Sequence, residues 1–270
     1  MRSALLASLD VEISASANEP MERGGIAYGS VSVLTSSLSL SGHHALKPTT
    51  IFVYGLAYRK HDLDATGTVL PDQLAELSVN LGLQHCFSPK WSGAVFLRPG
   101  FFSDFEDFSS DSLNVPVLAM FNYTPGPTLA WNFGLNVNAF AETPVFPIAG
   151  VRWQFAQDWT FTVGFPQSGV SWRTSDALTL RTGVGFNGGN YRITDNLGVP
   201  ASGINRLANT YVDFREVRVG LGADLRLGDK FTLGVDLGFV TDRKFDYYDR
   251  DFILDGDAGF YGTVALRTNF

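Results

Sequence analysis

The stretch AGFYGTVALRTNF (258–270) decides the fold class of this chain. Its large apolar residues fall on alternate positions, at Phe260, Val264, Leu266 and Phe270. A period of two is the period of a β-strand, because successive side chains leave opposite faces of the sheet. The stretch therefore predicts a strand with one apolar face and one polar face, which ends on an aromatic residue. Thr268 interrupts the apolar face.

The same alternation recurs along the whole chain, and no segment shows a sustained helical period. It is clearest in LAWNFGLNVNAF (129–140), WTFTVGF (159–165) and FTLGVDLGF (231–239). We predict 14 strands, over residues 4–14, 25–41, 50–61, 73–87, 91–105, 112–124, 128–141, 146–155, 159–165, 168–174, 177–193, 208–227, 231–246 and 258–270. The number falls to 12 if 159–174 is one strand bent around Pro166 and 4–14 is not a strand.

The composition limits the classes of protein to which this chain can belong. The chain is 45% hydrophobic, yet no run approaches 18 consecutive apolar residues, which excludes a transmembrane helix. Only 5 Lys and 7 Glu stand beside 15 Arg, 20 Asp, 28 Gly and 22 Phe, a mix that suits a confined wet interior. The net charge of −7 argues against a nucleic-acid partner, and the single Cys86 rules out an internal disulfide.

The connections between the predicted strands alternate between tight turns and longer loops. The turns contain SPK (88–90), PGP (125–127), AQD (156–158), TSD (174–176) and GDK (228–230), whereas 42–49 is long for a turn. Short turns on one side and longer loops on the other are expected of an outer-membrane barrel. We therefore predict an all-β fold, one antiparallel up-and-down transmembrane β-barrel over residues 1–270.

A soluble β-sandwich or lipocalin-like barrel is the alternative, because its strands also alternate. Its apolar face would point inward and its outer face would carry charge. The polar face here is rich in Gly, Asn and Thr instead of Lys and Glu, and large apolar residues are more numerous than one core needs. The membrane barrel is the favoured interpretation, since unpaired backbone groups in lipid oblige a sheet to close.

Two stretches resemble a known family: LPDQLAELSVNLGLQHCFSPKWS (70–92) and FPIAGVRWQFAQDWTFTVGFPQSGVSWRTSDALTLRTGVGFNGGNYRITD (146–195). From about residue 25 onward the chain is similar to an uncharacterised, porin-like family of Gram-negative outer-membrane barrels, a domain of unknown function. The resemblance implies this location and architecture, and no substrate. It also implies outer-membrane lipid as a partner, and the barrel-insertion machinery, which recognises a last strand that ends on a residue such as Phe270.

The first residues carry no convincing secretory signal, because Asp10 and Glu12 interrupt the apolar stretch early. We expect either a mature sequence or a reading frame that begins too late.

The charged residues on the predicted inner face are the candidate site. The candidates for lining the lumen are Arg59, Glu76, Arg98, Arg152, Arg181, Glu216, Arg218, Asp224, Arg226, Asp236 and Arg267. If Leu227 pairs with Phe231, and Phe231 with Phe270, then Asp224, Asp236 and Arg267 come close together at the periplasmic end. These charges either select solutes in a pore or form salt bridges that fill the lumen.

Other clusters of polar residues lie near the predicted outer rim. Acidic residues gather in DFED (104–107) and at Asp246, Asp249, Asp251, Asp255 and Asp257. Their spacing fits no EF-hand loop, so solvated loops are favoured over a cation site. His61 beside Asp62 and Asp64 is the best enzymatic candidate, although such a cluster often arises by chance. No phosphate loop, CxxC pair or nucleophile elbow is present, so we expect no catalytic site, metal or cofactor.

The function that we expect is a porin-like passive channel for small solutes. A barrel of 12–14 strands has a lumen between those of filled 8-stranded barrels and open 16-stranded porins. The runner-up is a structural barrel of the envelope with a lumen plugged by side chains. An outer-membrane enzyme is the third possibility.

Overall fold

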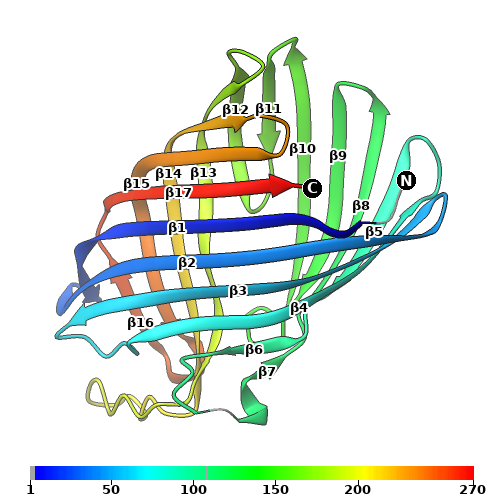
Figure 1. Ribbon diagram of the computed structural model, residues 1–270. Coiled ribbons are helices and arrows are strands. Elements are labelled where there is room, and N and C mark those ends of the chain that lie inside the picture. Colours follow the sequence, from blue (N-terminus) through cyan, green and yellow to red (C-terminus); the bar gives the residue numbers. More distant parts are fainter. Residues whose placement is uncertain (1–3, 108) are drawn as a thin grey trace.

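The computed structural model of the chain describes residues 4–107 and 109–270. One continuous sheet curls round until its first strand lies beside its last (Figure 1). β1 (Ala4–Arg23) pairs antiparallel with β17 (Gly259–Asn269), from Ser8 opposite Asn269 to Ser16 opposite Tyr261. The sheet is therefore a closed barrel, with no free edge along this seam.

The remaining elements follow in chain order. The strands are β2 (Ile26–Lys47), β3 (Thr50–Thr66), β4 (Gln73–Cys86), β5 (Trp91–Leu97), β6 (Gly100–Ser103), β7 (Leu113–Asn114), β8 (Val117–Gly126), β9 (Leu129–Val137), β10 (Val145–Ala156), β11 (Trp159–Val163), β12 (Gln167–Arg173), β13 (Leu178–Ile193), β14 (Thr210–Leu227), β15 (Phe231–Tyr247) and β16 (Phe252–Gly256). Two short 3-10 turns, η1 (Ser110–Ser112) and η2 (Tyr248–Arg250), lie in loops. Among the described residues, no helix is long and apolar enough to cross a membrane.

The wall of the barrel has 14 strands, as predicted. The elements are more numerous because three wall strands are interrupted, as β5 with β6, β7 with β8, and β16 with β17. Each wall strand pairs antiparallel with its neighbours in the chain. Several predicted boundaries are wrong, including the ends of β1, β2 and β3. β1 continues to Arg23 instead of ending at residue 14, and β2 continues to Lys47, so the predicted long turn 42–49 is short. Both strands are lengthened by pairing with each other.

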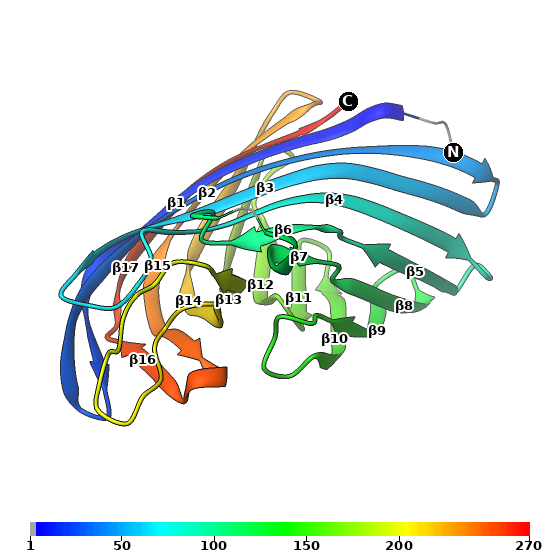
Figure 2. The ribbon, with the colours of Figure 1, turned by 90° about the horizontal axis from the view of Figure 1, so that it is seen from below.

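The two ends of the barrel differ. At the turn end, the strands are joined by short turns such as 48–49, 127–128 and 157–158, and β1 begins and β17 ends there. The backbone N–H of Phe270 donates to the carbonyl of Ala7 at 2.9 Å. At the loop end, longer connections such as 67–72 and 194–209 cover the mouth (Figure 2).

In most of the wall the apolar side chains point outward. We call this part the band, and it contains exposed large residues on almost every strand: Ile13, Leu38, Leu56, Leu83, Val95, Phe121, Phe133, Trp153, Phe161, Trp172, Val184, Val219, Leu237 and Val264. The aromatic residues near the turns also face outward. Trp159 stacks on Trp172 with ring centroids 5.3 Å apart, and Trp91 on Tyr123 at 4.5 Å. In the band, the large apolar side chains therefore lie on the outer face, as predicted.

Toward the loop end the polarity is reversed. We call this part the cap, formed by residues 19–33, 60–74, 188–215 and 242–257. Its inward side chains form an apolar core that includes Met21, Val31, Val33, Leu63, Leu74, Tyr191, Ile193, Val212, Phe214, Phe245, Tyr247, Phe252 and Leu254. Its outer face carries ion pairs, such as Arg215 with Asp242 at 3.2 Å and Lys60 with Asp62 at 2.5 Å. The cap is built like a small soluble barrel.

Two devices change the face on which apolar side chains lie. On β14, apolar residues move from even positions, Val212 and Phe214, to odd positions, Val217 and Val219. On β15, Thr241 is an extra residue, because Val217 pairs with Asp242 while Arg218 pairs with Val240. This β-bulge turns the following residues over.

Candidate functional site

The interior of the band holds a cluster of alternating charges on β13, β14, β15 and β17. Arg181 lies between two carboxylates, with Nε 2.9 Å from Asp224 and Nη1 2.8 Å from Asp236. Arg267 contacts the other side of Asp224, with Nη1 3.0 Å from Oδ1. Each carboxylate is therefore neutralised, and the cluster ties three neighbouring strands to β17.

The predicted register near this cluster is correct on one side and wrong on the other. Leu227 does pair with Phe231, but Phe231 pairs with Thr268 and not with Phe270. The difference of two residues keeps every side chain on its predicted face. Thr268 is fixed by β1, since its hydroxyl donates to the carbonyl of Leu9 and accepts from the Leu9 N–H, both at 3.0 Å.

A second charged group is fully buried where the band meets the cap. Glu216 accepts from two arginines, with Arg218 Nη2 at 2.6 Å and Arg243 Nε at 3.0 Å. Arg243 also donates to Ser16 Oγ at 2.6 Å and to the Val31 carbonyl at 2.8 Å. The group reaches from β14 and β15 to β1 and β2, so it closes this sector of the interior.

His61 does not form the enzymatic cluster that its neighbours in sequence predict. Its ring points inward and is completely buried, with Nδ1 2.8 Å from the hydroxyl of Thr35. Asp62 lies on the opposite face of β3, where it pairs with Lys60. The prediction of a rim site is wrong because adjacent residues of a strand point to opposite faces.

The apolar core of the cap blocks the loop end of the barrel. Phe214 stacks on Phe245 with centroids 4.7 Å apart, and its ring lies 5.0 Å from that of His61. Residues beyond the cap complete the core, since Phe102 and Phe140 are also buried. Burial raises the pKa of Tyr248 to about 12, so its hydroxyl keeps its proton and donates to the Phe140 carbonyl at 3.1 Å.

Asp104 ties two loops together above this core. The structure buries it completely, contrary to the expectation of a solvated acidic loop. Its carboxylate accepts from the backbone N–H of Thr194 at 2.7 Å and of Asp195 at 2.9 Å, and from the Thr194 hydroxyl at 2.6 Å. These bonds join the segment after β6 to the segment after β13, next to the pairing of Ser103 with Arg192. In the described part of the chain, no three His, Cys, Asp or Glu residues are placed to hold a metal ion.

A cavity of about 220 Å³ remains inside the barrel below the cap. Its lining is polar and combines residues of both charge clusters with glycines: Glu12, Arg59, Arg181, Gly183, Gly185, Asn187, Arg218, Gly222, Asp236, Thr263 and Arg267. Pro166 and Gln167, at the start of β12, also border it. The charged groups of both clusters therefore border one polar cavity.

The remaining predicted residues divide between paired and solvent-exposed positions. Arg98 lies 3.5 Å from Glu76, and its guanidinium stacks on Phe102. Arg152 and Arg226 are exposed, and the described residues offer neither of them an ion-pair partner. Their role as pore-lining residues stays a prediction. The sequence analysis missed Arg243, because the bulge at Thr241 reverses its face.

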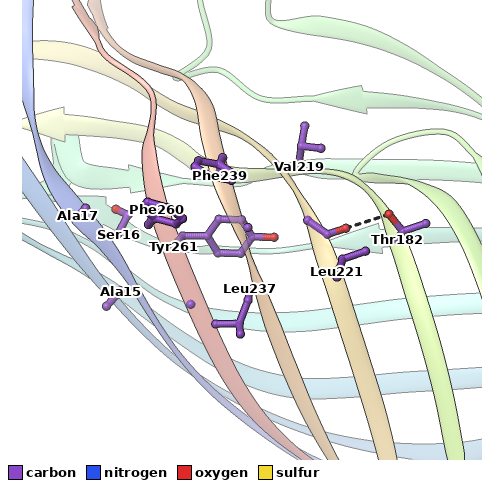
Figure 3. A pocket seen from close by; sticks show the side chains of 13 residues that line it. Ala15, Ser16, Ala17, Thr182, Val219, Leu221, Leu237, Phe239, Phe260 and Tyr261 are labelled. Carbon is purple, nitrogen blue, oxygen red and sulfur yellow. Dashed lines mark hydrogen bonds between the residues drawn. The ribbon is translucent and has the colours of Figure 1, made fainter.

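A larger hollow, of about 840 Å³, lies on the outer face of the band and is not part of the lumen. Val219, Leu221, Leu237, Phe239 and Phe260 border it, as Figure 3 shows. Its floor is thin because Gly220 and Gly238 face inward, and the ring of Tyr261 covers them from inside. A Cβ on Gly220 would come within 2.6 Å of the Tyr261 hydroxyl. The interior tyrosine thus fills the space that these glycines leave.

Comparisons with known proteins agree with this architecture. The solved COG4313 outer membrane channel from Pseudomonas putida F1 is similar over 100% of this chain and 96% of its own, with 10% identity and a TM-score of 0.52. A Pseudomonas aeruginosa FadL homologue gives 11% identity and a TM-score of 0.45, over 98% of this chain and 90% of its own. At such identities the likeness concerns the fold alone. No curated protein matches the chain.

The family comparison covers most of the sequence. The profile described as "Domain of unknown function (DUF6268)" matches residues 48–253, from the turn between β2 and β3 to the start of β16. The match includes both stretches on which the family resemblance depends. This chain belongs to the DUF6268 family.

Proposed function

We propose that this protein is a channel in the outer membrane of a Gram-negative bacterium, and that it passes small hydrophilic solutes through an interior narrowed by its own side chains. The observation that carries the proposal is the band. It is a closed wall with apolar side chains outside and a charged cavity inside. Lipid accepts only a closed sheet, and the polar interior gives water and solutes a place to pass.

The proposal also includes partners of the chain. Outer-membrane lipid covers the band, and the insertion machinery recognises β17 with its terminal Phe270. Deletion of Phe270 should lower the yield of assembled barrel in cells while leaving refolding of purified protein unchanged. Equal yields with and without Phe270 would refute this recognition.

Conductance of the purified protein in planar lipid bilayers tests the channel. We expect discrete steps smaller than those of open porins, because the cavity is small and the cap fills the axial exit. The measurement should be made in salts of different ion size, which gives the selectivity as well. Complete silence, with a barrel shown to be folded by its resistance to unfolding in detergent, would reject the channel.

A structural barrel with a plugged lumen is the second candidate. The observation that favours it is the cap, whose buried core and buried Glu216 group fill the loop end of the interior. The two candidates differ in one measurement, since a plugged barrel shows no conductance steps at any voltage that the bilayer withstands.

A further inference from the structure

The wall of the barrel has a notch above the hairpin of β11 and β12. β12 and β13 pair as far as Gln167 opposite Gly185, and the Phe186 N–H donates to the Pro166 carbonyl at 3.1 Å. Beyond this point, residues 187–191 of β13 pair with β14 on one side. On their other side, the described residues provide no strand until Arg192 meets Ser103 of β6.

The opposite edge of the notch is β10. Its pairing with β11 begins at Val151, whereas residues 145–150 pair only with β9 among the described strands. Pro147 lies in this unpaired part. Proline has no backbone N–H, so an edge that carries it does not readily accept another strand. Pro147 therefore helps to keep this edge of the notch free of a further strand.

The notch lies at the level where the outer surface becomes charged. Phe186 is the last large outward residue of β13, and Gly188, two residues further, pairs with Arg215. Arg215 forms the outward ion pair with Asp242. Apolar rings line the lower rim, where Phe165 is 6.3 Å from Phe146 and 5.4 Å from Phe186. The gap thus lies just beyond the band on its β13 edge, while exposed Val145 continues the apolar surface along its β10 edge.

Side chains bridge the notch at its upper limit. The amide of Asn138 donates to Asn190 at 2.9 Å, and the amide of Asn114 donates to Asn138 at 2.6 Å. These bonds join the segments after β9 and in β7 to β13. They separate the notch from the cap, whose core fills the barrel beyond them.

The polar cavity lies directly inside this gap. Pro166, Gln167 and Asn187 border the cavity at the notch, and Arg181 and Arg267 border it toward the turn end. The glycines at this place keep the passage free of side chains. A Cβ on Gly185, for example, would meet no atom within 4 Å.

We propose that the outer entrance of the channel is this side notch, and that small hydrophilic solutes bypass the filled axial mouth. The inference rests on the proposed function. The route runs over the β11–β12 hairpin, past Gln167 and Asn187, and between the arginines of the cavity. The volume of about 220 Å³ restricts it to solutes of the size of a single small metabolite.

Blocking the notch with a tryptophan tests the entrance. Gly185→Trp places an indole in the open space of the cavity directly inside the notch, and we expect the conductance steps of the wild type to be lost. Gly126→Trp is the matched control, because a Cβ on Gly126 also meets no atom within 4 Å but lies at a turn. The control should conduct like the wild type.

A second variant keeps the test valid if the tryptophan prevents folding. Gly185→Cys in a Cys86→Ser background should conduct until a bulky thiol reagent is added, and a reductant that removes the reagent should restore conductance. Gly126→Cys, treated in the same way, should be unaffected. Normal conductance through a blocked notch overturns the side entrance and leaves the channel intact, whereas a silent wild type overturns both.

Discussion

The band and the cap place their apolar side chains on opposite faces of the same wall. In the band, Leu237 and Val219 point outward and Asp236 and Arg181 inward. In the cap, Phe214 and Phe245 point inward, while the Arg215–Asp242 pair faces out. The same strands form both regions. The comparison teaches that the face of a strand is chosen by the solvent at each level, and not by the strand as a whole.

The junction between the two regions has the greatest energetic demands. There the wall must close over Glu216, Arg218 and Arg243, which lie between a polar cavity and an apolar core. A buried carboxylate is tolerable only while both guanidinium groups and their hydrogen-bond partners stay in place. Substitutions in the junction, the cap and the band should therefore differ in their effect on stability.

The largest effect is expected at this junction. Glu216→Ala should lower the free energy of unfolding by about 3–5 kcal/mol, because two buried arginines lose their carboxylate. Guanidinium titration of the barrel in lipid vesicles, followed by tryptophan fluorescence, measures the change. Arg215→Ala is the control, since it breaks only an outward ion pair of the cap and should cost about 1 kcal/mol or less. Equal losses in the two variants would contradict the burial of the group.

The core of the cap should behave like the interior of a soluble protein. Phe214→Ala should cost about 3 kcal/mol, because it removes buried contacts and leaves a cavity between Phe245 and His61. The same titration measures this loss. Phe133→Ala in the band should cost less, since acyl chains fill the space that the outward ring leaves. If Phe133→Ala is the more damaging change, the contrast between the two regions is wrong.

A charge on the outer face separates the two regions directly. Leu237→Arg, in the middle of the band, should destabilise the barrel in lipid by about 2–4 kcal/mol. Ser32→Arg, on the outer face of the cap and opposite Asp64, should change stability by about 0.5 kcal/mol or less. Should both variants tolerate arginine equally, lipid does not cover the band.

The smallest effect on stability is expected inside the band. Arg267→Ala leaves Asp224 paired with Arg181, so the loss should be about 1 kcal/mol. We expect a larger change in the conductance and ion selectivity, because Arg267 borders the cavity. Lys230→Ala, which removes an exposed charge in the turn between β14 and β15, serves as the control. If Arg267→Ala changes neither stability nor conductance, the cluster has no role in either.

The band was predictable from the sequence because the alternation of apolar and polar residues shows directly which residues share a face of a strand. LAWNFGLNVNAF and FTLGVDLGF each put large residues on one side of β9 and β15, and lipid exposure follows from their number. The strand count of 14 follows in the same way, since each turn separates two alternating runs. The register of the last strand was wrong by two residues, because parity is preserved by such a shift.

The cap was not predicted, because its apolar residues were too few to stand out beside those of the band. A signal existed on β14, where the alternation moves from even to odd positions between Phe214 and Val217. No such signal exists for Arg243, since a bulge is a property of pairing and not of one strand. Asp104 was misassigned for a similar reason. Its partners, Thr194 and Asp195, are far away in the sequence.

The extra residue at Thr241 divides β15 into two parts, in which side chains at odd positions point to opposite faces. If Thr241 were paired in regular register instead of bulging, Arg243 and Phe245 would turn toward the surroundings, and Asp242 and Lys244 would enter the aromatic centre. Deletion of Thr241 would leave these four side chains on their present faces, because Val240 and Asp242 would then be consecutive and would pair with Arg218 and Val217 without a bulge. Because of the bulge, apolar residues at odd positions of one strand face outward in the band, as Phe239 does, and inward in the cap, as Phe245 does.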